Sequence, residues 1–98
     1  MRFTFHPEAE EELNVAVDYY NRCQTNLGRD FAKEAYTAIR NIVALPEAWT
    51  PLSKNTRRCL VNRFPFGVIY QTENNEILII AIMQLNRKPG YWQDRIPH

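Results

Sequence analysis

The feature that most constrains this chain is a change in the spacing of its apolar residues near Pro46. Between residues 7 and 45, apolar residues recur every three or four positions, which is the spacing of an amphipathic helix. Pro46 ends that pattern, because proline lacks the N–H that a helix interior needs. From residue 57 onwards the apolar residues are mostly β-branched or aromatic, as in strands. The sequence therefore predicts helices in the first half and strands in the second.

Two helices are expected before Pro46. The first begins at Pro7, with His6 capping or preceding it, and ends near Asn26. The second begins around residue 29 or 30. Helices joined by so short a loop normally pack as an antiparallel hairpin. The first turns also carry four acidic residues, which we interpret as a solvated face that favours the helix dipole rather than as a metal site: Glu8, Glu10, Glu11 and Glu12.

Strands are expected at residues 2–6, 57–63, 66–72 and 77–83. The last of these is nearly all apolar, so we expect a central strand that is covered on both faces. Asn74 and Asn75 suit a tight hairpin turn before it. The predicted fold is α+β, in the order β-α-α-β-β-β, with the helix hairpin packed on one face of a mainly antiparallel sheet.

A chain of 98 residues has room for one domain, which we expect to span residues 1–98. No apolar run approaches the roughly 20 residues that span a bilayer, and the N-terminus shows no signal peptide, so a cytoplasmic protein is expected. Cys23 and Cys59 lack the paired spacing of a zinc site. We interpret them as buried thiols, with a disulfide as the less favoured alternative. Nothing in the sequence indicates a cofactor or a metal.

The near-neutral net charge of +1 conceals an asymmetry. Residues 1–53 hold five basic and eight acidic residues, whereas residues 54–98 hold seven basic and three acidic ones. This predicts a basic face for binding a target or nucleic acid, made by Arg57, Arg58, Arg63, Arg87, Lys88 and Arg95 with Tyr91 and Trp92 between them. The alternative is that the two aromatic residues pin the tail to the core while the arginines solvate the sheet edge.

Four stretches, which together cover nearly the whole chain, resemble the RelE/ParE toxins of bacterial toxin–antitoxin modules. They are residues 5–13, with their acidic helix start, residues 18–20 with 27–31, residues 58–70 and residues 87–95. The third contains an arginine at position 58, then Arg63-Phe64-Pro65-Phe66, then Ile69-Tyr70. The fourth is similar to the closing segment common on the ParE side, so the resemblance is closer to that branch.

The resemblance implies a toxin of a type II toxin–antitoxin or plasmid stabilisation module, which a cognate antitoxin holds inactive in a hetero-oligomer. ParE-like members poison DNA gyrase, whereas RelE-like members cut mRNA on the ribosome without a metal. Gly67 stands where the nuclease branch commonly has an arginine, and Gln84 where ParE relatives often have a histidine. We therefore expect a ParE-like gyrase inhibitor.

Two alternatives to the gyrase inhibitor stay open. One is a ribosome-dependent mRNA endonuclease that uses Arg58, Arg63, Arg87 and Tyr91. The other is a non-toxic interaction module that retains the fold. The antitoxin is expected to be an acidic, disordered protein that folds on binding. The aromatic residues that are candidate anchors for it, or else members of the core, are Tyr19, Tyr36 and Trp49.

Overall fold

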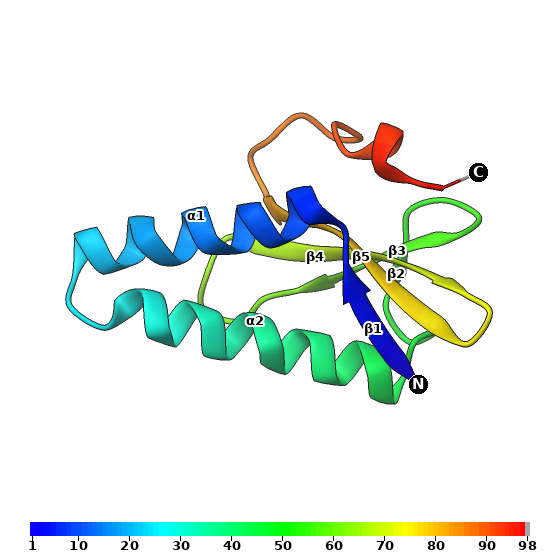
Figure 1. The fold of residues 1–98 in the computed structure, drawn as a ribbon, viewed down its shortest axis with the longest axis horizontal. Coiled ribbons are helices and arrows are strands. Elements are labelled where there is room, and N and C mark those ends of the chain that lie inside the picture. The colour runs from blue at the N-terminus through cyan, green and yellow to red at the C-terminus, as the bar shows by residue number, and fades with distance from the viewer. Residues whose placement is uncertain (98) are drawn as a thin grey trace.

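The computed structural model describes residues 1–97 and shows the predicted α+β order, with one strand more than expected. The elements are β1 (Arg2–Phe5), α1 (Pro7–Cys23), α2 (Leu27–Ala44), β2 (Thr50–Pro51), β3 (Thr56–Leu60), β4 (Phe66–Glu73), β5 (Glu76–Gln84) and the single 3-10 turn η1 (Gln93–Arg95). The additional strand is β2, which lies in a segment predicted to be a loop. Figure 1 shows the two helices side by side against the sheet.

The five strands form one sheet in the order β1-β5-β4-β3-β2. The pairs from β2 to β5 are antiparallel, but β1 pairs with β5 in parallel. The sheet is therefore mixed rather than antiparallel throughout. The helix hairpin carries the chain across the sheet before the three long strands begin, so β1 joins the free side of β5. In the turn between β4 and β5, Asn74 and Asn75 both have a positive φ, as the Asn-Asn pair predicted.

The two helices begin and end where local hydrogen bonds satisfy their backbone. The His6 side chain caps α1 by accepting a hydrogen bond from the Glu8 backbone N–H at 3.1 Å. The first helix ends at Cys23, three residues before the expected end, because Gln24 takes an extended conformation with a φ of −160° and a ψ of 139°. Asn26 then takes a left-handed φ of 67° in the turn before α2. The Gly28 N–H then donates to the Asn21 side-chain oxygen at 2.8 Å, which fixes the hairpin.

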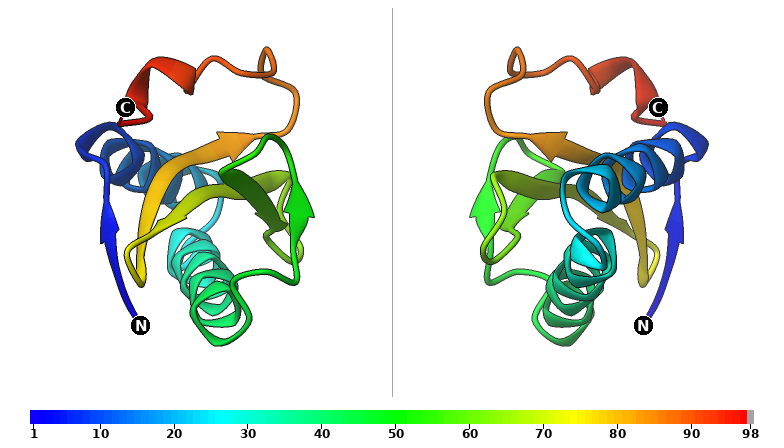
Figure 2. Two further views of the ribbon diagram at one scale, coloured as in Figure 1. Left: turned by 90° about the vertical axis from the view of Figure 1, so that its right-hand side faces the viewer. Right: turned by 90° about the vertical axis from the view of Figure 1, so that its left-hand side faces the viewer.

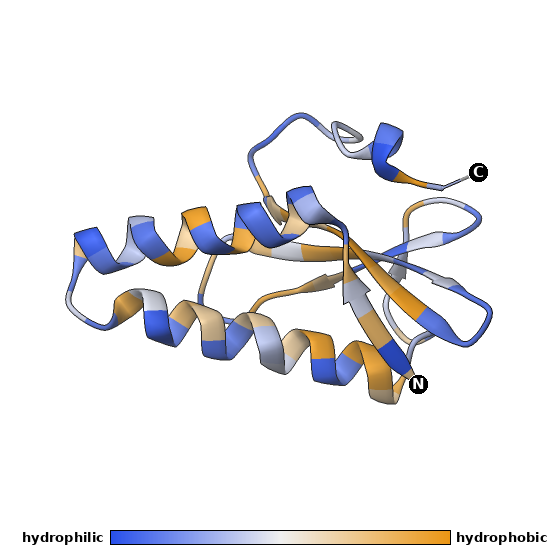
Figure 3. Ribbon diagram, viewed as in Figure 1, coloured by the Kyte–Doolittle hydropathy of each residue, from blue (hydrophilic) through white to orange (hydrophobic). Residues whose placement is uncertain are grey.

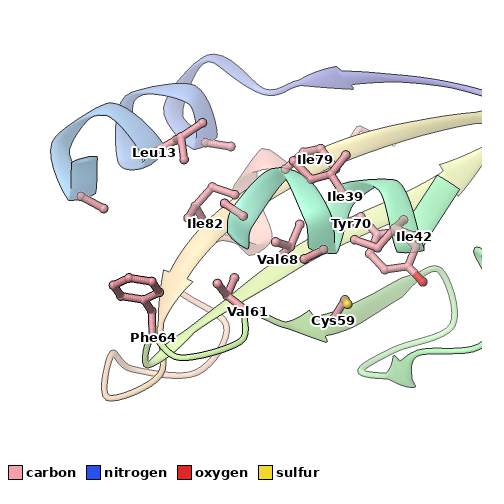
Figure 4. Packing of buried hydrophobic residues seen from close by; sticks show 14 of the residues in the cluster. Leu13, Ile39, Ile42, Cys59, Val61, Phe64, Val68, Tyr70, Ile79 and Ile82 are labelled. Atoms are coloured by element: carbon pink, nitrogen blue, oxygen red, sulfur yellow. The ribbon is translucent and has the colours of Figure 1, made fainter. Parts of the chain in front are cut away.

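A hydrophobic core fills the space between the hairpin and the sheet. Figure 4 shows side chains of this core from α1, α2 and the strands, including Leu13, Ile39, Val68 and Ile79. Apolar and hydrophilic stretches alternate along both helices in Figure 3, whereas β5 is apolar along most of its length. This is the pattern expected of two amphipathic helices that pack on one face of a sheet.

A second core lies on the opposite face of the sheet, where residues 85–96, called the tail below, cover it. Figure 2 shows the tail and α2 on opposite sides of the sheet. The buried members of this core are Ile69, Ile80, Ala81, Met83 and Trp92. A bulge places Ile80 and Ala81 in the same core, because Ile69 pairs with Ala81 while the next residue pairs with Ile79. The prediction that β5 is covered on both faces is confirmed.

The two cysteines lie in different environments. Cys59 is buried, as expected, and burial raises the pKa of its thiol. Cys23 is exposed at the last residue of α1, so the prediction that it is buried was wrong. Both are free thiols. Within residues 1–97, no helix is both long and apolar enough to cross a membrane.

The close approach of the two helices at Gly28 generates a test of the hairpin. A Cβ at this position would overlap the carbonyl oxygen of Val17 and lie 2.7 Å from Asn21 Cγ. We expect Gly28→Ala to lower the free energy of unfolding by about 2 kcal/mol, although alanine is the better helix former. Urea unfolding followed by circular dichroism measures this, with Lys33→Ala on the exposed side of α2 as the control. An unchanged or higher stability of Gly28→Ala would contradict the close packing.

Candidate functional site

Three of the eight predicted site residues, Arg87, Tyr91 and Arg95, contact an acidic residue, Glu12 of α1. Its carboxylate accepts hydrogen bonds from the Tyr91 hydroxyl at 2.8 Å and from the backbone N–H of Ile82 at 3.0 Å. Arg95 donates to both carboxylate oxygens, at 2.9 and 3.0 Å. The interpretation that Glu12 belongs to a solvated face was therefore wrong: its side chain is only 17% exposed and joins α1, β5 and the tail.

Arg95 holds the tail against the first helix. Its side chain is 9% exposed, and besides Glu12 it donates to the Ile80 carbonyl at 3.1 Å. The Glu8 carboxylate lies 3.6 Å from its Nε. Burial by itself lowers the pKa of Arg95, but the hydrogen bonds and charge of Glu12 outweigh this effect and raise it. These contacts use the guanidinium within the chain, so the structure gives Arg95 a positioning role; a direct binding role stays a prediction.

Tyr91 lies between the Glu12 carboxylate and Arg87. The Arg87 guanidinium carbon is 3.8 Å from the centre of the Tyr91 ring, a cation–π contact. Burial raises the pKa of Tyr91, and so do the hydrogen bond and the charge of Glu12. The phenol is therefore neutral at neutral pH, and its proton is donated to a carboxylate. The neighbouring Trp92 is 5% exposed and belongs to the second core, so both aromatic residues make the tail contacts that the alternative interpretation anticipated.

Arg57 and Arg63 lie apart from this group. Arg57 donates to the backbone carbonyls of Glu47 at 3.0 Å and Trp49 at 2.8 Å, which anchors the segment that precedes β2. Arg63 has a left-handed φ of 72° in the turn between β3 and β4. Its guanidinium is 3.9 Å from the Asp30 carboxylate, at the start of α2. The eight predicted site residues therefore do not form one continuous face.

Arg58 points away from the helix hairpin. Its neighbour Cys59 belongs to the core under the helices, and alternate residues of a strand face opposite sides of the sheet. A Cβ at Gly67 would lie 3.0 Å from Arg58 Cγ, so the Arg58 stem passes over Gly67. Arg58 Nε is shielded from water and has no hydrogen-bond partner within residues 1–97.

A concave region of about 560 Å³ opens beside Arg58, between the tail and β3. We call it the tail groove, and its lining consists of Leu52, Ser53, Arg58, Met83, Leu85, Arg87, Pro89, Gly90, Trp92, Gln93 and Ile96. Of the predicted site residues it brings together Arg58, Arg87 and Trp92, while Lys88 lies exposed outside this lining.

A second groove, also of about 560 Å³, runs between α1 and the ends of β4 and β5. Its exposed apolar members are Val15 and Tyr19, and Arg87 lines both grooves. Among the other candidate anchors, Tyr36 is exposed, whereas Trp49 packs against the main core and donates its indole N–H to the Asn41 carbonyl at 3.4 Å. Trp49 therefore serves as a core residue.

Sequence reasoning missed Glu12 and the leucines of the tail groove. A signal for Glu12 was present, since it lies three residues after Ala9 and four before Ala16, on the buried stripe of α1. Leu52 and Leu85 gave no such signal, because each is a single apolar residue in a loop. For metals, no cluster of three or more histidine, cysteine or acidic side chains in residues 1–97 is close enough to hold an ion.

Comparison with models of known protein families identifies the family of this chain. Residues 3–89 match the model of the ParE toxin of the type II toxin–antitoxin system parDE. The chain belongs to this ParE toxin family. The match stops at Pro89, before Tyr91 and Arg95, which donate hydrogen bonds to Glu12. No curated protein matches this ParE-family chain closely enough to count as a relative.

Comparison with solved structures supports the fold. One match is a chain of the chromosomal ParDE TA system from P. aeruginosa, with 18% sequence identity and a TM-score of 0.76. The similarity covers 88% of this ParE-family chain and 97% of that chain. The α+β fold inferred from the resemblance is thus confirmed.

The buried pairing of Glu12 with Arg95 generates a stability test. Glu12→Gln removes the buried carboxylate of Arg95 and leaves only the more exposed Glu8, at 3.6 Å, so we expect the free energy of unfolding to fall by about 3 kcal/mol. We also expect the tail to detach, which moves the emission of Trp92 to longer wavelength. Glu11→Gln, one position away and exposed, is the control and should change neither quantity. A Glu12→Gln protein with wild-type stability and emission would show that the carboxylate does not hold the tail.

Proposed function

We propose that this chain is the cytoplasmic toxin of a parDE-type pair, held inactive in a complex with its cognate antitoxin. We further propose that it inhibits a DNA-linked target such as gyrase and does not cut mRNA. Membership of the ParE toxin family supports the first statement. The second rests on the state of Tyr91 in the structure.

The observation that carries this proposal is the hydrogen bond of the Tyr91 hydroxyl to Glu12 at 2.8 Å. Metal-independent RNA cleavage needs groups that take a proton from the ribose hydroxyl and return one to the leaving oxygen. A neutral tyrosine whose pKa is raised is a poor base, and its proton is already donated to a carboxylate. Arg63 lies beside α2, away from Arg58 and Arg87. This arrangement supports recognition of a protein target over nuclease chemistry.

A specific observation also favours the nuclease as a second candidate. The Arg58 side chain passes over Gly67, the position at which the nuclease branch commonly carries an arginine. A guanidinium is therefore present on that face of the sheet although residue 67 has no side chain. An experiment has to decide between the two activities, and the Tyr91 hydroxyl offers the sharpest distinction.

The test measures both activities on the same purified protein. With gyrase, plasmid DNA and ATP, we expect supercoiling to stop or cleaved plasmid to accumulate. In a ribosome-dependent translation reaction, primer extension should show no new breaks in the message. Tyr91→Phe removes only the hydroxyl and leaves the Arg95 pair with Glu12, so we expect it to inhibit gyrase like the wild type. Added antitoxin should restore supercoiling.

Breaks in the message that vanish in Tyr91→Phe would overturn the gyrase proposal and establish the nuclease. A protein that affects neither gyrase nor translation, and whose expression leaves growth unchanged, would instead be a non-toxic member of the family. The proposal requires that Tyr91→Phe retains gyrase inhibition and that neither protein breaks the message.

A further inference from the structure

One side of α1 carries exposed apolar side chains between two charged ones. Val15 and Tyr19, one helical turn apart, are 56% and 54% exposed. Glu11 and Arg22 lie on the same side of the helix, because positions 11, 15, 19 and 22 follow one another at helical spacing. We call these four residues the α1 stripe. An apolar centre with a charged rim is the composition of a surface that contacts another protein.

The α1 stripe borders the groove of about 560 Å³ between α1 and the ends of β4 and β5, called the helix groove below. All four residues of the stripe line this groove, and its apolar lining also includes Tyr20, Phe66 and Ile82. The Tyr19 ring lies beside Tyr20, with the ring centres 5.2 Å apart. One surface therefore offers both an exposed tyrosine and a concave apolar site that can accept a tyrosine.

The two ends of the α1 stripe have opposite charges. Glu11 lies toward the start of α1 and Arg22 toward its end, about 16 Å further along the helix axis. None of the ion pairs within residues 1–97 involves either side chain. Glu12, the other acidic residue of the helix groove, is already hydrogen-bonded to Arg95. The stripe is therefore negative at one end and positive at the other, with its apolar residues between.

A second copy of the chain matches this pattern of charge. A ligand of one sign, such as a nucleic acid or an acidic peptide, is attracted at one end of the stripe and repelled at the other. When two copies of α1 pack antiparallel, Glu11 of each lies beside Arg22 of the other, and Val15 of each lies beside Tyr19 of the other. Both pairs are centred on the same point of the helix, near Val17, so one register satisfies the charged and the apolar residues together.

We propose that two copies of this chain form a dimer through their α1 stripes, which pack antiparallel about a two-fold axis near Val17. Tyr19 of each copy enters the helix groove of the other, and Glu11 of each pairs with Arg22 of the other. The contact is built mainly on one helix of 17 residues, so the interface is small and the dimer exchanges with the monomer. We expect a dissociation constant of about 10 μM. The inference does not depend on the proposed function.

Asp18 opposes this dimer and so reports on its geometry. Asp18 is exposed and adjoins the stripe, because it lies three residues after Val15 and four before Arg22. It is also next to the two-fold axis, so the two copies bring their Asp18 carboxylates close together. We expect Asp18→Asn to tighten the dimer by about two- to fivefold.

The first test compares two exposed tyrosines, Tyr19 and Tyr36. Sedimentation equilibrium of the full chain, in a reducing buffer, measures the dissociation constant of the dimer. Tyr19→Ala should raise it by about 30-fold or more, because each dimer loses both of its aromatic anchors. Tyr36→Ala is the matched control: Tyr36 is 43% exposed on α2 and does not line the helix groove, so the constant should stay within about twofold.

The second test exchanges the charges of the stripe. Glu11→Arg and Arg22→Glu each place like charges opposite one another in both pairs, so each should weaken the dimer by about 10-fold or more. The double variant restores opposite charges and should bind within about threefold of the wild type. Lys33→Glu, on the exposed side of α2, controls for the change of net charge. Because all these positions are exposed, melting temperatures should stay within about 5 °C of the wild type.

Several results would overturn the inference. A wild type that stays monomeric at about 1 mM protein does not form this dimer. A dimer that Tyr19→Ala leaves unchanged, or that the double charge variant does not restore, uses another surface. A dimer that Cys23→Ser abolishes is a disulfide product of the exposed thiol at the end of α1.

The same variants separate this inference from the proposed function. If the wild type is monomeric and Tyr19→Ala instead loses affinity for the antitoxin, the helix groove belongs to the antitoxin and the inference fails while the proposed function stands. If the wild type dimerises as described but affects neither gyrase nor translation, the proposed function fails and the dimer is established.

Discussion

The carboxylate of Glu12 is the interaction on which the arrangement of this protein depends. It lies on the first helix, yet its hydrogen-bond partners are the backbone of β5, Tyr91 and Arg95. Through these bonds one side chain connects the helix hairpin, the central strand and the tail. Such a pairing is costly to break, because removal of one partner leaves the other charge buried and unpaired. The position of the tail therefore depends on this carboxylate together with the second core, in which Trp92 is buried.

The tail in turn decides which basic residues are available to a partner. Arg95 is used within the chain, and Arg87 lies over the Tyr91 ring. Arg57 and Arg63 contact other parts of the molecule, near Trp49 and Asp30. Arg58, which lines the tail groove, and Lys88, which is exposed, form no ion pair within residues 1–97. The structure therefore separates the predicted basic residues into those that contact other parts of the chain and those that stay accessible, although the net charge of the chain is only +1.

Much of the fold followed from local patterns. The helical spacing, Pro7 and Pro46 placed the hairpin, and Asn74 and Asn75 placed the last turn. The predicted end of the first helix, near Asn26, was wrong by three residues, because Gln24 is already extended. Two features of the sheet were missed: the parallel pairing of β1 with β5 and the short strand β2. Both depend on which edges of the sheet are free after the hairpin has packed, and no local pattern records that.

The candidate site, like the fold, could be predicted from the sequence only in part. The sequence by itself determined the α+β order, the apolar faces of the helices, the burial of β5 and the concentration of arginines in the second half, because these depend on near neighbours along the chain. Only the tertiary structure decided which arginines are free. Glu12 and Arg95 are 83 residues apart in sequence and meet at 2.9 Å, and Arg58 of one strand passes over Gly67 of the next. Contacts of this kind depend on packing over long separations, so a list of basic residues does not reveal which of them a partner can reach.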